Sequence, residues 1–494
     1  FGRNQYSTWN VEPQLEYKQD IWRGKLSVLL GATLNDKKNN NLYVEGSGYS
    51  SDALMEAFDA ASVIDASSVK SQYRYQALFG RINYNIADKY LISLTGRRDG
   101  SSRFGEGKQF SNFGAVGAAW IFTSEKWLQN LPVLSFGKLR GSYGVTGNDQ
   151  IGDYQFVETW EPSAITYQGA SGLLPSTIYN SGYAWEKNNK LEAALELGFL
   201  KDRLLFSVNY FQNRSGNQLV NYRLPYTTGF NSILSNFPAK VENKGWEISL
   251  SGTVIKAGRF AWESNANLTL PKNTLLEFPD IESSTYNNTY KVGQSLNVIN
   301  TLVFLGIDTQ TGLPQFLDVN NSGTYTTADY QVIGNRDPKF YGAWQNTFKF
   351  AGLELQVFFD FKKQTGRSAN FSFYSTSTYP GTISNQLVDV LGRWQNVGDQ
   401  TDLPKFLPTS TLTTLPGSSF GYSDQSYIRL RNVSLGYTLP KTALSKIGAK
   451  HARIYLQGQN LYTFNRDKGY DPEIQNIYVS PALRSYALGV QISY

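Results

Sequence analysis

The 494-residue chain contains no cysteine, one methionine and one histidine. Without cysteine there is no disulfide framework, no thiolate metal site and no cysteine nucleophile. Histidine is the most frequent general base near neutral pH, and only His451 could serve. Chemistry that pairs a nucleophile with an imidazole is therefore nearly excluded, and we expect the protein not to be an enzyme.

Long basic runs and long apolar runs are also missing. The 46 Lys and Arg against 40 Asp and Glu give a net charge of +6, and the bases are scattered, with doublets such as Lys37-Lys38. Nothing resembles a nucleic-acid-binding arm, so we expect no nucleic-acid partner. No stretch approaches the roughly 20 apolar residues of a membrane-spanning helix, which excludes a helical membrane protein. The chain begins at Phe1 without a signal-like segment, which suggests processing or a longer parent.

What the chain has is alternation of apolar and polar residues in segments of about ten residues, the pattern of strands with two different faces. It is clear in residues 246–254, 262–270 and 486–494. In the last of these, one face carries Tyr486, Leu488, Val490, Ile492 and Tyr494. Residues 191–199 and 353–361 repeat the pattern with acidic side chains on the polar face. The sequence therefore predicts an all-β protein.

A β-sandwich would also alternate, but the connections favour a transmembrane barrel. Tight turns are predicted at 87–89, 201–202, 256–258 and 351–352. Long loops are predicted at 36–71, 145–188, 214–243, 272–338 and 363–425. Short turns that alternate with long loops are typical of outer-membrane barrels, in which the two sets lie on opposite sides of the membrane.

Two further features favour the same fold. Aromatic residues gather at strand ends, as the girdles of a membrane barrel do: Tyr84, Trp120, Phe122, Trp127, Tyr210, Phe211, Trp246, Trp262, Tyr437 and Tyr494. The polar faces carry charges that a dry sandwich core would not accept but a watery lumen would: Glu247, Glu263, Lys349, Glu354, Asp360, Lys362, Arg429 and Arg431. A large soluble propeller or solenoid remains the alternative, although no fixed-period repeat supports it.

Several longer motifs resemble one known family along nearly the whole chain. They include residues 79–105, 138–154 and 185–219, LPYTTGF at 224–230, VENKGWEISL at 241–250, and residues 393–406, 426–441 and 452–473. On these motifs the chain resembles the C-terminal part of the barrel of a SusC/RagA-type TonB-dependent outer-membrane transporter.

The resemblance implies a barrel of about 22 strands behind a plug domain. Counting back from Tyr494 gives about 15 antiparallel strands, too few and of the wrong parity for a closed single-chain barrel. We therefore expect residues 1–494 to be the C-terminal portion of the barrel. The plug domain, the TonB-binding segment and the first strands would lie outside this chain, which another segment would complete.

The resemblance also implies a location, partners and a mechanism. The location is the outer membrane, in contact with its lipid. A SusD-like surface lipoprotein would cover the long loops and capture an oligomeric nutrient, a glycan by preference and an oligopeptide second. The TonB–ExbB–ExbD complex would supply energy, and transporter–lipoprotein pairs would form a dimer. The alternatives are a passive porin-type channel and a soluble carbohydrate-binding or adhesion β protein.

The segment DVNNSGTYTTAD at 318–329 has the spacing of a calcium-binding loop. The oxygen ligands would come from Asp318, Asn320, Ser322, Thr324 and Asp329. Aspartate replaces the usual glutamate at the twelfth position, and two ligands are neutral, which lowers the expected affinity for calcium. The alternative is an Asx-turn loop held by its own hydrogen bonds. No other cofactor is expected.

Two further motifs carry weaker signals. GSSFG at 417–421 matches the G-x-S-x-G nucleophile elbow, but it lies in a long polar loop. The long loops are rich in aromatic residues, which grip sugars or peptides, or else pack the loops on each other or on a lid protein. These are Trp160, Tyr167, Trp185, Tyr222, Tyr226, Phe230, Tyr286, Tyr374, Tyr379 and Tyr422. No single substrate-binding residue can be assigned from the sequence.

Overall fold

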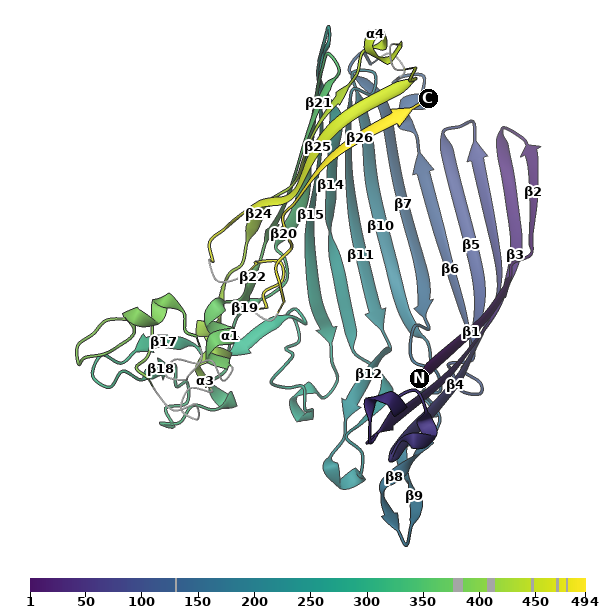
Figure 1. Ribbon diagram of the computed structural model, residues 1–494. Coiled ribbons are helices and arrows are strands. Elements are labelled where there is room, and N and C mark those ends of the chain that lie inside the picture. Colours follow the sequence, from purple (N-terminus) through teal and green to yellow (C-terminus); the bar gives the residue numbers. More distant parts are fainter. Residues whose placement is uncertain (129–130, 376–384, 407–413, 446–447, 468–470, 477–478) are drawn as a thin grey trace. The chain divides into compact units, whose positions relative to one another are not determined.

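The computed structural model describes residues 1–494 except 129–130, 376–384, 407–413, 446–447, 468–470 and 477–478 (Figure 1). Contacts divide the chain into two compact units, each built from several segments. The first comprises Phe1–Ser124, Arg140–Glu192 and Asn213–Lys240. The second comprises Glu125–Leu139, Ala193–Gln212 and Val241–Tyr494.

Most of the described residues in strands belong to one antiparallel sheet. Its strands are β1 (Gly2–Val11), β2 (Gln14–Ile21), β3 (Gly24–Ser47), β4 (Val63–Ile86), β5 (Tyr90–Ser101), β6 (Phe110–Trp120), β7 (Leu134–Asn148), β10 (Glu186–Phe199), β11 (Leu204–Gly216), β14 (Lys240–Ala257), β15 (Phe260–Glu277), β20 (Phe340–Phe350), β21 (Leu353–Lys363), β24 (Tyr427–Thr438), β25 (His451–Asn465) and β26 (Ser485–Ser493). Neighbours in the sheet follow one another along the chain once the loop strands are set aside.

The first two strands share one position in the sheet. β1 pairs with residues 34–43 of β3 and β2 with residues 24–31, and Pro13, which has no N–H to donate, lies between them. The sixteen strands described therefore fill fifteen positions, since β1 and β2 count as one. The all-β antiparallel fold and the count of about 15 strands predicted from the sequence are confirmed.

The long connections carry small elements of their own. Two-stranded sheets are formed by β8 (Thr159–Tyr167) with β9 (Ala170–Thr177), β12 (Gln218–Arg223) with β13 (Ser232–Phe237), β16 (Val298–Thr301) with β19 (Gln331–Asn335), β17 (Phe304–Ile307) with β18 (Pro314–Phe316), and β22 (Thr365–Arg367) with β23 (Tyr422–Asp424). The helices are α1 (Ala369–Ser375), α3 (Thr414–Gly417) and α4 (Lys441–Leu444), with 3-10 turns η1 (Asp52–Leu54), η2 (Phe58–Ala60), η3 (Phe122–Ser124), η4 (Tyr226–Thr228), η5 (Ile281–Ser283), η6 (Thr327–Asp329), η7 (Val388–Gly392) and η8 (Ser419–Gly421). Within the described ranges, no helix has both the length and the apolar character needed to cross a membrane.

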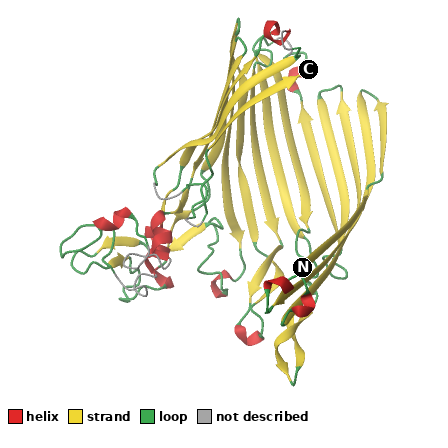
Figure 2. Cartoon of the chain, in the orientation of Figure 1, coloured by secondary structure: helices red, strands yellow, loops and turns green. Residues whose placement is uncertain are grey.

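The predicted tight turns are present between β4 and β5, β10 and β11, β14 and β15, and β20 and β21. Ala87 and Asp88 both have positive φ, as do Ala351 and Gly352, which is the backbone of hairpin turns that match strand twist. In the first unit, such short turns lie at one end of the strands, and η1, η2 and the β8–β9 hairpin lie at the other (Figure 2).

The loop predicted over residues 36–71 is wrong in its extent. β3 continues to Ser47 and β4 begins at Val63, and the two stay in register throughout. Where both faces of a hairpin meet water, the apolar–polar alternation that reveals a strand disappears. The run Asn39-Asn40-Asn41 therefore reads as a loop although it lies within β3.

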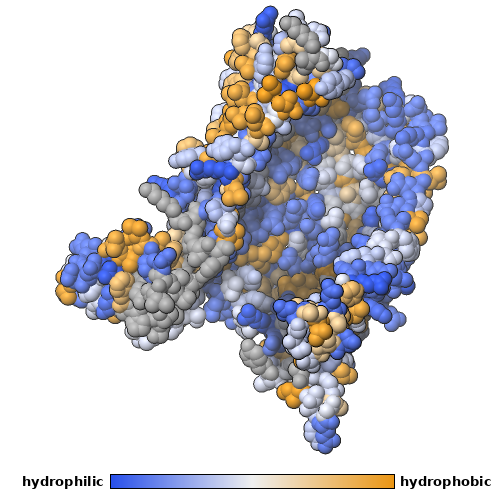
Figure 3. Space-filling model, in the orientation of Figure 1, coloured by the Kyte–Doolittle hydropathy of each residue, from blue (hydrophilic) through white to orange (hydrophobic). Residues whose placement is uncertain are grey.

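The strands of the first unit have an apolar face and a polar face. On β5, Ile92 and Leu94 are 43% and 47% exposed although they are aliphatic. The alternate residues Ser93, Thr95 and Arg97 lie on the opposite face, which is largely hydrophilic where the strands β4 to β6 are seen in Figure 3. Exposed aliphatic side chains on one face are expected where that face meets lipid.

A small core fixes the loops of the first unit against the strand ends. Phe104, Tyr183 and Trp185 are buried together, and the Phe104 and Trp185 rings lie 4.7 Å apart. The indole N–H of Trp185 donates to the Gln109 carbonyl at 3.0 Å. Phe113, which packs on this core, also covers Gly147 so closely that a Cβ there would lie 2.1 Å from the ring. A side chain at position 147 would therefore require the Phe113 ring to move.

Candidate functional site

The polar face of the first unit carries an aromatic and charged cluster near the middle of β4. The Tyr73 and Tyr75 rings stack with centroids 6.5 Å apart. The guanidinium of Arg103 lies 4.2 Å from the centroid of Tyr73, and that of Arg97 lies 5.8 Å from the centroid of Tyr75. Arg97 also pairs with Asp99 and donates to the hydroxyl of Tyr75. Cation–π contacts therefore hold both tyrosine rings.

The same cluster fastens the loop after β7. The Tyr73 hydroxyl donates to Asp149 Oδ2 at 2.5 Å. Arg103 donates to Asp153 Oδ1 and to the Asp149 carbonyl, each at 2.7 Å. Charge-assisted hydrogen bonds of this length are among the stronger ones in proteins. The loop at residues 149–154 is therefore held to the polar face by ion pairs as well as by apolar packing.

A cavity of about 440 Å³ opens beside this cluster. Its lining combines ring faces with amide, carboxylate and ammonium groups, among them Asn10, Glu12, Lys37, Tyr73, Asp149 and Trp185. This volume is in the range of small-molecule sites, and rings edged by hydrogen-bonding groups suit ligands that alternate apolar patches with polar groups. The cavity can therefore accept part of a polar oligomer.

The second unit has a charged network on the polar face of β24. Arg429 is 1% exposed and donates to Asp471 Oδ1 at 2.6 Å and to Glu473 Oε2 at 2.8 Å. Arg431 binds Asp360 through two nitrogens, at 2.9 and 2.7 Å, and reaches Glu473 at 3.2 Å. The structure thus brings the predicted residues Asp360, Arg429 and Arg431 into one network.

The other charges predicted on this face are engaged locally. Lys349 donates to Glu263 at 3.0 Å, and Glu354 accepts from Arg453 at 2.9 Å. Glu247 accepts from Asn209 at 3.1 Å, and Lys362 lies opposite Tyr427 in the sheet register. Sequence reasoning missed Arg453, Asp471 and Glu473. No spacing rule joins them to their partners, which lie 99, 42 and 44 residues away.

The loop aromatics divide into packed and exposed rings. Trp185 and Tyr374 are each 5% exposed in loop cores, Tyr222 stacks on Phe237, and Tyr286 stacks on Tyr290. Trp160 and Tyr167, on the β8–β9 hairpin, are 52% and 79% exposed. Packing thus accounts for the buried rings, and the hairpin presents two rings to solvent. The predicted residue Tyr379 lies outside the described residues.

In the predicted calcium loop, the side-chain oxygens of Asp318, Asn320 and Ser322 form hydrogen bonds with backbone groups of the loop itself. The Asp318 carboxylate accepts the N–H groups of Ser322 and Gly323 at 3.1 and 2.8 Å, and Asn320 Oδ1 accepts that of Ser322 at 3.0 Å. Ser322 Oγ donates to the Thr324 carbonyl at 2.9 Å. These are the contacts of an Asx-turn.

Asp329, at the end of the same segment, is fully buried and closes the capping box of η6. It accepts the N–H groups of Thr326 and Val319, each at 2.9 Å. These hydrogen bonds, above all the one from Thr326, hold the pKa of the Asp329 carboxyl below its usual value. Across the ranges that the structure describes, no cluster of three or more His, Cys, Asp or Glu side chains is arranged to hold a metal ion. Calcium at this loop stays a prediction.

The G-x-S-x-G match has a different context from a nucleophile elbow. Ser418 is fully buried and donates to the Leu415 carbonyl at 2.7 Å, and Ser419 Oγ accepts the Phe304 N–H at 2.9 Å. The motif lies between α3 and β23 rather than between a strand and a helix, and His451 begins β25. Both hydroxyls therefore hold the loop together.

Comparison with known proteins gives consistent matches along the chain. The family model "TonB dependent receptor-like, beta-barrel" matches residues 1–461. TonB-dependent receptor P26 of Formosa agariphila is 29% identical over 499 residues, which cover 95% of this chain and 50% of that protein. TonB-dependent receptor SusC of Bacteroides thetaiotaomicron is 25% identical over 549 residues, covering 100% of this chain and 52% of SusC.

A solved structure of the RagAB peptide transporter matches with a TM-score of 0.88 at 23% identity, covering 100% of this chain and 56% of that one. This likeness shows the fold. The chain spans about half the length of the curated relatives it matches. It belongs to the TonB-dependent receptor-like β-barrel family of the outer membrane, and it is similar to SusC in sequence and to the RagAB transporter in fold.

Proposed function

We propose that the chain forms part of a TonB-dependent active importer of an oligomeric nutrient across the outer membrane. The observation that carries this proposal is a sheet whose apolar face is exposed while its other face holds charges, tyrosines and a cavity. Such a sheet separates lipid from a watery passage. The outer membrane contains no ATP, so uphill import needs energy delivered from the inner membrane by the TonB–ExbB–ExbD complex.

A glycan is the substrate class that the cavity of the first unit favours. Tyrosine and tryptophan rings can stack on the C–H faces of sugars, while Asn, Asp and Lys at the ring edges bond the hydroxyls. An oligopeptide is the second candidate, since RagAB is named a peptide transporter. Separate uptake measurements with a neutral oligosaccharide and with a charged oligopeptide distinguish the two substrate classes.

A SusD-like surface lipoprotein is the proposed partner, in a dimer of transporter–lipoprotein pairs. Exposed rings such as Trp160 and Tyr167 on the β8–β9 hairpin support a contact there, because aromatic residues are enriched at protein interfaces. Gentle detergent extraction of the full-length protein, followed by mass spectrometry, should recover a lipoprotein in equal amount. Recovery of the barrel alone under several mild detergents would contradict this part of the proposal.

Energy dependence decides between active import and a passive channel. Cells that carry the full-length protein should take up a fluorescent oligosaccharide mixture or a fluorescent oligopeptide mixture, and deletion of TonB should abolish this uptake. The purified protein should show no steady conductance in planar bilayers. Uptake that persists without TonB, together with steady conductance, would establish the porin-type alternative.

Calcium in the 318–329 loop is a second, separate proposal. The five residues that would supply oxygen ligands lie in one compact segment, and binding a cation would require their oxygens to exchange their present hydrogen-bond partners for the metal. Calcium would stabilise this loop without taking part in transport.

A further inference from the structure

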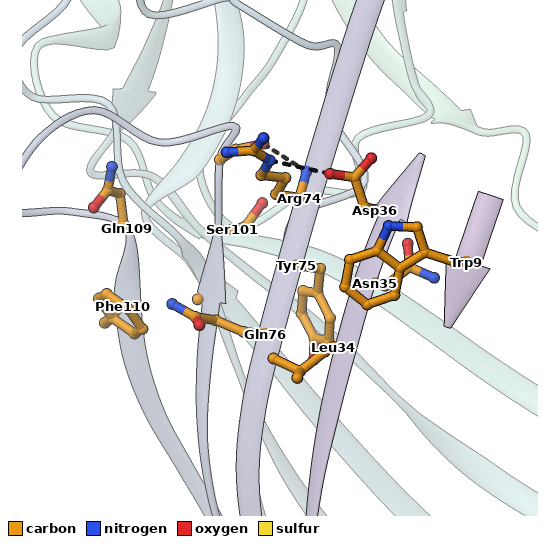
Figure 4. Close-up of a pocket in the computed structure, with 12 residues that line it drawn as sticks. Trp9, Leu34, Asn35, Asp36, Arg74, Tyr75, Gln76, Ser101, Gln109 and Phe110 are labelled. Atoms are coloured by element: carbon orange, nitrogen blue, oxygen red, sulfur yellow. Dashed lines mark hydrogen bonds and ion pairs between the residues drawn. The ribbon is translucent and has the colours of Figure 1, made fainter. Parts of the chain in front are cut away.

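The apolar face of the first unit ends in a pocket of about 370 Å³ that plays no part in the proposed transport. Trp9 of β1 and Phe110 of β6 lie on opposite sides of it, and the Arg74–Asp36 pair lies between them (Figure 4). Leu34 and Gln76 continue its lining. The pocket thus joins apolar side chains to an arginine on one surface.

The strand register places this pocket on the lipid-facing side. Leu34 pairs with Gln76, and Asp36 pairs with Arg74, so these four residues share a face with Leu30 and Leu78. Leu30 and Leu78 are 55% and 67% exposed, as lipid-facing side chains are. The pocket is therefore on the outside of the sheet, opposite the cavity of the polar face.

Its depth corresponds to a membrane boundary. Tyr84, on the same face, lies near the tight turn at 87–89 and marks the other boundary. Ten residues at about 3.3 Å each, tilted by about 40°, place Arg74 about 25 Å higher, which is the height of the apolar band of such barrels. Trp9 and Phe110, which are 51% and 45% exposed, then lie where aromatic girdles lie.

Basic side chains surround the pocket on this face. The register of β1, β3 and β4 puts four bases on the outward side at or beyond the pocket: Arg3, Lys38, Lys70 and Arg74. Arg98 of β5 is on the same side but pairs with Leu78, nearer the middle of the apolar band, and its guanidinium extends to Phe110 of the lining. These five basic residues are all exposed. Within these described strand segments Asp36 is the acidic residue on the same side, and it is buried against Arg74 and Gln72. The patch therefore keeps an excess of positive charge at the membrane boundary.

Two arginines are positioned to bind an anion. Arg74 reaches Asp36 through its Nε atom, at 3.1 Å, and the Arg74 side chain is 68% exposed, which leaves its two Nη atoms available to an anion. Arg98 lies 5.2 Å from the centroid of Phe110, and its Nη1 atom makes a long contact of 3.4 Å to Asn112. A planar guanidinium held in this way matches the geometry of a phosphate group.

We propose that this pocket binds the phosphate-bearing headgroup of an anionic membrane lipid, with Arg74 and Arg98 on the phosphate and Trp9, Leu34 and Phe110 against the upper part of the acyl chains. An amphipathic ligand is required because the pocket is both basic and apolar and lies at the end of the apolar band. The lipid would fix the barrel wall in the bilayer at this depth.

Native mass spectrometry of the full-length protein, stripped of lipid in detergent, tests this site. Titration with phosphatidylglycerol should give tighter binding than titration with phosphatidylethanolamine. A basic residue near a charged lipid surface changes affinity by about fivefold, so the double variant Arg74→Gln/Arg98→Gln should weaken phosphatidylglycerol binding by about tenfold or more. Arg81→Gln is the matched control, since Arg81 lies on β4 with its side chain on the opposite face.

If the double variant fails to assemble, Gln76→Glu serves instead, because it adds a negative charge to an exposed lining position. This variant should also weaken phosphatidylglycerol binding. Equal binding of the two lipids, or an equal loss in Arg81→Gln, would overturn the proposal. Displacement of phosphatidylglycerol by inorganic phosphate at the same concentration would identify a free-anion site and would also overturn it.

Discussion

Arg429 provides the sharpest test of how the charged network stabilises the second unit. The variant Arg429→Met keeps much of the side-chain length and removes the guanidinium. Arg429 is 1% exposed, and its three polar partners are Asp471, Glu473 and Thr463. The variant thus leaves two carboxylates of the loop segment after β25 without their main cation.

The size of the effect follows from how well each partner is compensated. Breaking a buried ion pair by removing one partner costs about 3–5 kcal/mol. Glu473 is 40% exposed and keeps Arg431, so it loses little. Asp471 is only 12% exposed, but its Oδ1 atom also accepts the N–H of Glu473. We therefore expect the lower end of that range, about 3 kcal/mol in the free energy of unfolding.

Urea unfolding of the full-length protein in detergent, followed by tryptophan fluorescence, measures this change. The midpoint of unfolding should shift while the dependence of the unfolding free energy on urea concentration stays the same. Lys349→Met is the matched control. Lys349 and Glu263 also form an ion pair between two neighbouring strands, but their side chains are 42% and 41% exposed. An exposed pair contributes less than about 1 kcal/mol. If Arg429→Met and Lys349→Met destabilise the protein equally, burial does not govern the strength of these pairs and the reasoning fails.

Three further predictions concern two loop regions and one strand, β7. Lys363 lowers the pKa of Asp424 to about 2, so the stabilisation of the two-stranded β22–β23 sheet should be complete above the ordinary carboxyl pKa and lost as the pH falls toward 2. The protection of the amides of these two strands from hydrogen exchange should fall over the same pH range, and Asp424→Asn should abolish this pH dependence. Millimolar calcium should protect the 318–329 loop from proteolysis, and Asp318→Asn should remove the protection; the same response in both proteins would refute calcium binding. Gly147→Val should destabilise the first unit by about 1–3 kcal/mol, because its side chain would meet the ring of Phe113. The second substitution Phe113→Ala should restore part of that loss, and independent effects would contradict the steric explanation.

The sequence predicts the fold well wherever the two faces of a strand meet different media. Residues 246–254 alternate because one face meets lipid and the other water, and β14 covers them. The turn Ala351-Gly352 is readable because positive φ favours glycine. Where both faces meet water this signal vanishes, which is why the continuation of β3 and β4 reads as a loop.

The site was less predictable, since it depends on contacts between distant segments. The inward position of Arg429 follows from period two, but its partners lie in a loop without periodicity. The burial of Trp185 depends on Phe104, 81 positions earlier in the chain, with which it stacks. No local sequence pattern distinguishes an aromatic residue that packs within a loop from one that binds a ligand.

Cysteine labelling along β5 tests most directly whether one face of this sheet meets lipid and the other meets a watery passage. The chain has no cysteine, so single substitutions report cleanly once any cysteine elsewhere in the full-length protein is removed. In native outer membranes, a small membrane-impermeant thiol reagent should modify Ser93→Cys and Thr95→Cys but spare Ile92→Cys and Leu94→Cys. Equal labelling at all four positions, or the reverse alternation, would contradict the assignment of a transport wall.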